Sequence, residues 1–180
     1  MRKVVRSVLG VAIALSPALV FAQAGPASTA TDVPTAQVQA GLKRAVEELK
    51  PGVTVSDHLL SLPDIGKYNV GVAVVARPAG TFQNSLSHDK ITEIYYVLRG
   101  SGIQVTGTMV DGTRSANVSK TIGPGMSSNA PLQNGRSTKL GPGDVQIVPP
   151  GVGHGFTSID PGGIEYLIFR IDTDHVLALQ

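Results

Sequence analysis

The sequence predicts an all-β protein, an antiparallel sandwich or barrel, preceded by one short amphipathic helix. From Val53 onward, short runs of β-type residues are separated by Gly, Pro, Asn or Asp, with no helical segments between them. Before Val53, one segment has the residue spacing of an amphipathic helix. The chain has 180 residues, of which 42% are hydrophobic and 16% charged, and this composition suits a single folded domain.

The first 24 residues have the pattern of a cleaved secretory signal peptide. Three basic residues within the first six positions precede an uncharged apolar run over residues 8–22, and small residues then offer a cleavage site. The alternative is a membrane anchor, but the run is shorter than the ~20 residues that span a bilayer, and Pro17 interrupts it. We therefore expect an exported protein, periplasmic or extracellular, without a stable membrane anchor.

Charge and composition exclude several classes of partner and site. The chain has 15 Lys and Arg against 13 Asp and Glu, and three of the basic residues lie in segment 1–24, so the remainder has a net charge of −1. A near-neutral domain lacks the basic surface that nucleic acids and anionic lipids attract, and we expect no nucleic-acid partner. Because the chain has no Cys, disulfides, thiolate metal sites and cysteine nucleophiles are excluded.

Residues 25–52 are expected to form a flexible lead-in and the amphipathic helix. The first part, 25–33, is small and polar, and the helix is predicted over 35–50 because Pro51 and Gly52 end it. Its apolar face is expected to lie against the β domain that follows. Apolar residues recur on this face at spacings of 4, 4 and 3, namely Val38, Leu42, Val46 and Leu49.

Residues 53–180 are expected to form the β domain. Stretch 111–143 differs from the rest because it is rich in Gly, Ser, Asn, Thr and Pro and has few large apolar residues. We expect it to be a long loop, either a functional lid or simply mobile. The strands are predicted at 53–61, 68–77, 92–99, 102–110, 144–149, 154–159 and 164–171.

Two segments, 88–100 and 143–154, resemble the two spaced motifs of the cupin superfamily, in the same order. The first has a His, four residues, a Glu, six residues and a Gly; the second has a Gly, five residues, Pro-x-Gly, two residues and a His. The matching residues are His88, Glu93 and Gly100 in the first segment, and Gly143, Pro149, Gly151 and His154 in the second.

The resemblance covers about residues 68–172 and implies a jelly-roll β-barrel that holds one divalent metal. Cupins usually bind the metal through three His and one Glu, which assigns His88, Glu93 and His154 as ligands here. The chain departs from the pattern at Leu86, where the first His of the motif is expected, and at Ser158, where an Asn is usual. Three of four ligands remain, so a metal site and an empty or weakly occupied pocket both stay open.

The residue types support the same site. Side chains alternate along a strand, so Glu93, Tyr95 and Val97 share a face, which points inward in a small barrel. A buried carboxylate is costly unless it is paired, protonated or bound to a cation. Two imidazoles and one carboxylate suit Fe, Mn, Ni, Co, Cu or Zn, and the same set forms the facial triad of ferrous oxygenases. An ordinary hydrogen-bonded His88–Glu93 pair is the alternative. Tyr95 is a candidate hydrogen-bond donor or acid, or a core residue.

The cupin resemblance implies several functions. One hypothesis is a metal-dependent enzyme of dioxygenase, lyase or isomerase type acting on a small organic molecule. The other is a non-catalytic module that binds a ligand or metal. A homodimer is compatible with both. His58 and His175 are expected at the surface. A nucleotide-binding glycine loop and a nucleophile elbow are not found in the sequence.

Overall fold

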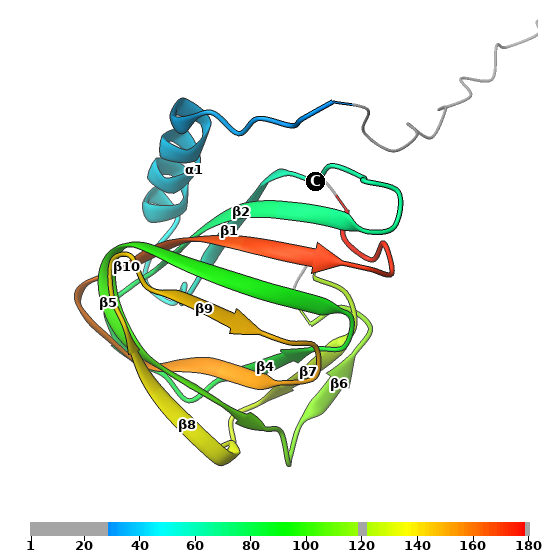
Figure 1. The fold of residues 1–180 in the computed structure, drawn as a ribbon. Helices are drawn as coiled ribbons and strands as arrows, with labels where there is room; N and C mark the ends of the chain where they lie inside the picture. The colour runs from blue at the N-terminus through cyan, green and yellow to red at the C-terminus, as the bar shows by residue number, and fades with distance from the viewer. Residues whose placement is uncertain (1–28, 119–121, 179–180) are drawn as a thin grey trace, which may run out of the picture.

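The computed structural model describes residues 29–118 and 122–178, which form one helix followed by ten strands (Figure 1). The predicted signal peptide, residues 1–24, lies outside the described residues. Among the described residues, no helix has the length and hydrophobicity needed to cross a membrane. The predicted all-β fold with a short N-terminal helix is therefore confirmed.

The elements follow one another along the chain with short connections, and the helix comes first. Their bounds are α1 Thr35–Glu47, β1 Ser56–Ser61, β2 Asn69–Arg77, β3 Gly80–Thr81, β4 Ser85–His88, β5 Ile91–Thr108, β6 Thr113–Ser115, β7 Gly125–Ser128, β8 Gln133–Leu140, β9 Val145–Val148 and β10 Gly153–Asp172.

Two antiparallel layers are joined by the long strands β5 and β10, which run through both. In one layer the order is β1-β2-β10-β5-β9, built from the C-terminal half of β10 and the N-terminal half of β5. In the other layer the order is β8-β5-β10-β4-β7-β6, built from the opposite halves of the two strands. Alternate side chains from both layers point inward and form the core, as expected for a jelly roll.

The long strands bend where glycines meet. The sequence predicts separate strands at 92–99 and 102–110, and at 154–159 and 164–171, whereas the structure joins each pair into one strand. Gly100 and Gly163 have φ angles of +73° and +82°, which glycine adopts without strain. A Cβ atom on Gly100 would lie 1.9 Å from the Gly163 carbonyl oxygen. The motif glycine is therefore required for the close approach of β5 and β10 at the bend.

The prediction of a long loop over 111–143 is wrong, because this stretch contains β6, β7 and β8. β8 is a polar strand whose residues are mostly exposed, since it pairs on one side only, with β5. The backbone hydrogen bonds that pair β8 with β5 do not require apolar side chains. A polar sequence can therefore form this strand, and its composition resembles that of a loop. The short strands β3 and β4 also escaped prediction, and β4 carries His88.

Helix α1 packs on the outside of β1 and β2 (Figure 1). It ends at Glu47, three residues before the predicted end. Leu42 and Ala45 are buried, and a Cβ on Gly41 would press against Leu60 and Val74, so the helix lies close to the sheet there. Val46 is 46% exposed, which contradicts its expected place on the buried face. The face of α1 that contacts the sheet is therefore rotated towards Gly41 and Ala45, because these small residues allow the closest approach of the helix to the sheet.

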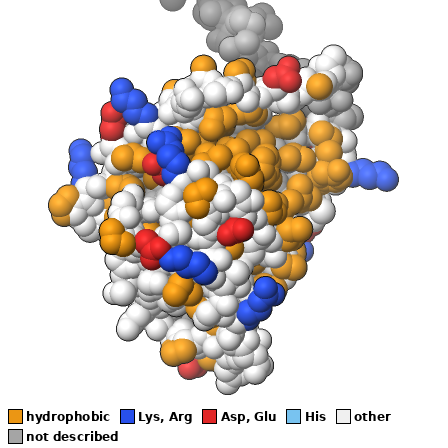
Figure 2. All heavy atoms as spheres, turned by 60° about the vertical axis from the view of Figure 1, so that its left-hand side comes forward, with side chains coloured by type: hydrophobic (Ala, Val, Ile, Leu, Met, Phe, Trp, Pro, Cys, Tyr) orange, Lys and Arg blue, Asp and Glu red, His pale blue; other side chains and the backbone are white. Residues whose placement is uncertain are grey.

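Apolar side chains also lie on the outer surface. Figure 2 shows a broad hydrophobic area on one face of the molecule, with few charged side chains within it. Among the described residues, Val145 and Ile147 of β9 are 59% and 63% exposed, and the neighbouring Tyr96 of β5 is 39% exposed. Exposed apolar area is typical of surfaces that meet a partner. The homodimer stays a prediction.

Candidate metal centre

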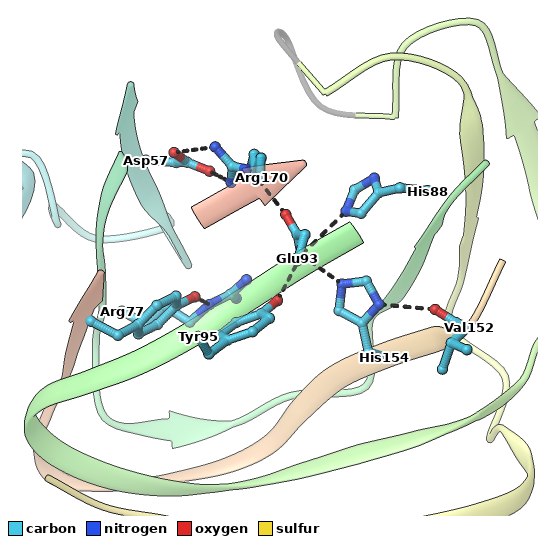
Figure 3. A network of polar contacts seen from close by, with 9 residues as sticks. Asp57, Arg77, His88, Glu93, Tyr95, Val152, His154 and Arg170 are labelled. Atoms are coloured by element: carbon cyan, nitrogen blue, oxygen red, sulfur yellow. Dashed lines mark hydrogen bonds and ion pairs between the residues drawn. The ribbon is translucent and has the colours of Figure 1, made fainter. Parts of the chain in front are cut away.

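Three strands bring His88, Glu93 and His154 together inside the barrel (Figure 3). His88 ends β4, Glu93 lies near the start of β5, and His154 lies near the start of β10. All three are buried, and one ligand atom from each lies within 4.8 Å of the others. The expected inward face of β5 is observed, since Glu93, Tyr95 and Val97 are all buried. We call this group the His/Glu/His cluster.

The cluster lies in a cavity of about 490 Å³. Aromatic and aliphatic side chains form part of its wall, and polar and charged side chains form the rest. The residues that line it include Asp57, Val75, Arg77, Phe82, Leu86, His88, Glu93, Tyr95, Gln104, His154, Phe156, Tyr166 and Arg170.

One oxygen of Glu93 is the centre of the cluster. The Oε2 atom lies 3.2 Å from His154 Nε2 and 3.6 Å from His88 Nε2. It also accepts a hydrogen bond of 2.9 Å from the Tyr95 hydroxyl. Ligand atoms about 2.1 Å from one metal ion lie about 3.0–3.4 Å apart in octahedral or tetrahedral geometry. The two separations from Glu93 Oε2 are close to this range and all three ligand atoms lie within 4.8 Å of one another, so the residues present fit one transition-metal ion.

The hydrogen bond at His154 Nδ1 shows which nitrogen of this ring carries the hydrogen and which carries a lone pair in the neutral form. His154 Nδ1 lies 3.0 Å from the Val152 carbonyl oxygen, which can only accept, so Nδ1 carries the hydrogen. In the neutral ring, Nε2 then presents a lone pair to the carboxylate oxygen of Glu93. Two acceptors in contact require a proton or a cation between them. Holding a ligand imidazole through its second nitrogen is the usual arrangement in metal sites.

His88 is held in its neutral form. Burial lowers the pKa of His88 to about 4, although the charge of Glu93 opposes this. Its Nδ1 atom is buried and has no hydrogen-bond partner among the described residues. A neutral imidazole is the form that coordinates a metal.

The second oxygen of Glu93 is bound by Arg170, which sequence reasoning did not find. Arg170 Nε donates to Glu93 Oε1 over 3.0 Å, while its two terminal nitrogens donate to both oxygens of Asp57 on β1. Burial alone raises the pKa of Glu93, but the hydrogen bond that His154 donates when a proton lies between the two, together with the charge of Arg170, outweighs it and holds this pKa well below its ordinary value. Glu93 is therefore ionised and oriented. A charged residue at an inward position of the 164–171 run was the signal for Arg170.

Of the other residues that the sequence analysis considered, two lie at the cavity and two lie away from it. Tyr95 lies in the site, and burial together with the nearby Glu93 charge raises its pKa well above the ordinary value, so its phenol stays protonated. Leu86 lines the cavity and is paired in register with His154, so the expected ligand position lies at the site but has an apolar side chain. His58 instead contacts Glu48, and His175 is exposed near the C-terminal end. These two histidines are not brought to the cluster.

We expect the chelator-treated protein to lose about 3 kcal/mol of stability as the pH falls from about 6.5 to about 4. His88 has a pKa of about 4 in the folded protein and about 6.5 when unfolded, so the unfolded chain takes up the proton first. The contribution is complete above pH 6.5 and is lost as the pH falls through this window. Urea unfolding at pH 7, 5.5 and 4.5 measures it. A His88→Asn variant should have a flatter profile, and an equally steep profile in both proteins would contradict the prediction.

The chain is similar to known proteins in two comparisons, one with family models and one with solved structures. A family model described as Cupin matches residues 52–179. Among solved structures, KdgF from Halomonas sp. is 15% identical, with 68% of this chain and 83% of that chain covered and a TM-score of 0.41. The DMSP lyase DddQ from Ruegeria pomeroyi is 18% identical, with 76% and 56% covered and a TM-score of 0.45. The polyketide cyclase RemF from Streptomyces resistomycificus is 21% identical, with 70% and 75% covered and a TM-score of 0.42. No curated protein sequence matches the chain.

Proposed function

Because the chain belongs to the cupin family, we propose that His88, Glu93 and His154 bind one divalent transition-metal ion, which receives a small organic molecule in the cavity. The observation that carries this proposal is the contact of two imidazole nitrogens with one ionised carboxylate oxygen inside the barrel. When the His154 ring is neutral, its lone pair faces that oxygen, and a cation between them would remove the repulsion.

The donor set indicates the kind of metal. Two nitrogens and one oxygen, with no thiolate, suit Fe, Mn, Ni, Co, Cu or Zn. Three protein ligands leave coordination positions for a ligand that carries oxygen donors, and Leu86 supplies no fourth donor. When bound, the metal supplies Lewis-acid polarisation of such a ligand.

The protein residues around the cluster hold it in place. Arg170 fixes one oxygen of Glu93, and Tyr95 donates to the other, so the carboxylate has a single orientation. The Val152 carbonyl keeps the hydrogen of His154 on the nitrogen that faces away from the cluster. These contacts organise the site before a metal or ligand arrives, which lowers the cost of binding.

Two functions use such a site. The first is a metal-dependent enzyme of dioxygenase, lyase or isomerase type acting on a small organic molecule. The second is a non-catalytic binding module, which one observation favours: among the described residues that line the cavity, the one carboxylate outside the cluster, Asp57, is held by Arg170, and no further histidine is present to act as a base. Stabilisation by a ligand that is recovered unchanged would distinguish the second function from the first.

The metal content of the purified protein tests the proposal. The protein is prepared without chelators or a His tag, incubated anaerobically with Fe²⁺, Mn²⁺, Ni²⁺ or Zn²⁺, desalted and measured by inductively coupled plasma mass spectrometry. We expect about one metal per chain in the wild type, and its loss in His88→Ala and His154→Ala, because each change removes one of only three ligands.

His175→Asn is the matched control, because it also removes an imidazole but lies outside the cluster, and Asn tolerates the positive φ of 53° at this position. This variant should keep the metal. Thermal unfolding of all variants shows whether they are folded. A wild-type protein that retains none of the four metals would overturn the proposal, as would equal retention in all variants.

A further inference from the structure

Arg77, at the end of β2, is a cation that lines the cavity. Its Nε donates to the Tyr166 hydroxyl over 3.0 Å, and its guanidinium lies 5.7 Å from the centre of the Phe156 ring. Among the described residues, no Asp or Glu forms an ion pair with it, whereas Arg170 is paired with both Asp57 and Glu93. An arginine stays charged in a protein and offers a planar fork of donors to a carboxylate. The terminal nitrogens of Arg77 are available for such a ligand.

A row of aromatic rings runs from the His/Glu/His cluster to the rings that Arg77 contacts. The ring centres of His154 and Tyr95 are 6.3 Å apart, those of Tyr95 and Tyr166 are 5.1 Å apart, and those of Tyr166 and Phe156 are 6.0 Å apart. Arg77 contacts the last two rings of this row, Tyr166 and Phe156. In Figure 3, Arg77 appears on the side of Tyr95 away from His88 and His154. The His/Glu/His cluster therefore lies at one end of this row of rings, and Arg77 contacts the two rings at its other end.

A second unpaired polar group lies beside the same aromatic ring. Gln104 is only 1% exposed, lines the cavity and is paired in register with Phe156. Its amide oxygen has no hydrogen-bond partner in the described part of the chain. A buried amide without a partner costs free energy, and the two ends of an amide side chain can exchange places. With the two ends exchanged, the amide NH2 group of Gln104 would donate a hydrogen bond to a ligand carboxylate at this end of the cavity.

The charges of the cavity indicate the charge of the ligand. Asp57 and Glu93 balance Arg77 and Arg170, so the charged side chains that line the cavity sum to zero. One divalent cation would raise this sum to +2. A ligand with two anionic ends would restore neutrality, with one end at the cluster and the other at Arg77.

We propose that Arg77 and Gln104 form a carboxylate-binding subsite, and that the ligand is a small organic acid whose other end carries the oxygen donors that meet the His/Glu/His cluster. The second half of this inference rests on the proposed metal function. Arg77 and Gln104 then select ligands by their distal carboxylate, while the row of aromatic rings receives the short carbon chain between the two ends.

Paired probes test the subsite on the metal-loaded protein. Malate, 2-hydroxyglutarate and 2-hydroxyadipate carry the same chelating end and a distal carboxylate. The corresponding 2-hydroxy monoacids have a methyl group in its place. Isothermal titration calorimetry should show at least one diacid binding about 10- to 100-fold more tightly than its monoacid, since a charge-assisted hydrogen bond has this effect. Arg77→Met should abolish the difference, and Gln104→Leu should reduce it. Arg99→Met, at an exposed arginine paired with Glu165, should leave it unchanged.

The outcomes separate the two proposals. Equal binding of all diacids and monoacids, no binding of any diacid, or an undiminished difference in Arg77→Met would each overturn the subsite, whether or not the metal binds. Metal content that is normal in Arg77→Met, together with a lost preference for the diacid, supports it. Failure of the wild type to retain a metal is the separate result that overturns the proposed metal function. Because the probe comparison uses the wild type, the test stands even where a variant does not fold.

Discussion

Replacing Arg170 by Leu is expected to destabilise the protein by about 3–5 kcal/mol, the range measured when one partner of a buried ion pair is removed. Arg170 is 2% exposed and holds both Glu93 and Asp57. Without it, Glu93 remains in the barrel without its counter-ion, and its pKa rises because burial then dominates. Such a loss is a large part of the total stability of a domain and lowers the melting temperature by about 10 °C or more.

Two further variants identify the cause of this loss. Arg99→Leu removes an arginine whose side chain is 67% exposed and paired with Glu165, so it should cost only about 0–1 kcal/mol. Adding Glu93→Gln to Arg170→Leu removes the uncompensated charge and should restore part of the stability. Calorimetry or urea unfolding measures all three. If Arg170→Leu were no less stable than Arg99→Leu, the buried ion pair would not have the role given to it here.

Replacing Leu86 by His is expected to tighten metal binding at least about tenfold, which corresponds to 1.4 kcal/mol. Residues 86 and 88 lie two apart on β4 and therefore share a face, and Leu86 is paired in register with His154. An imidazole at position 86 would enter the cavity beside the three ligands and add a fourth donor to them. Competition with a chromogenic chelator measures the affinity for Zn²⁺ and Mn²⁺.

Position matters more than residue type in this prediction, and two controls test it. Ser85→His puts the same imidazole on the opposite face of β4 and should leave the affinity unchanged. Leu86→Ala removes the apolar side chain without adding a donor. If Leu86→His bound metal no more tightly than Leu86→Ala, residue 86 would not be a ligand position.

Local signals were sufficient for the main features of the fold and for the cluster. The alternation over 92–99 predicted that Glu93 and Tyr95 face inward, and the resemblance of the two spaced motifs to those of cupins singled out His88 and His154. Alternation works because successive side chains on a strand point to opposite faces. Whether the three residues bind a metal stays a prediction, as do the signal peptide and export.

The predictions from the sequence were wrong where contacts between distant segments, rather than the local residue pattern, determine the structure. The strands within 111–143 form because partners elsewhere supply the backbone hydrogen bonds, so their polar composition resembled that of a loop. Likewise, β5 and β10 continue through their bends because they remain paired with each other beyond the glycines. A run of residues carries no information about a partner that lies far along the chain.

The sequence by itself determined the fold class and the N-terminal helix, because each depends on a periodicity within short segments, and its resemblance to the two cupin motifs singled out the three residues of the cluster. Only the tertiary structure decided what surrounds the cluster. Asp57 and Arg170 are 113 positions apart, and Arg77 and Tyr166 are 89 apart, yet each pair is in contact. Such pairs arise when the layers close on each other, and they determine which charges in the cavity are balanced and which is left for a ligand.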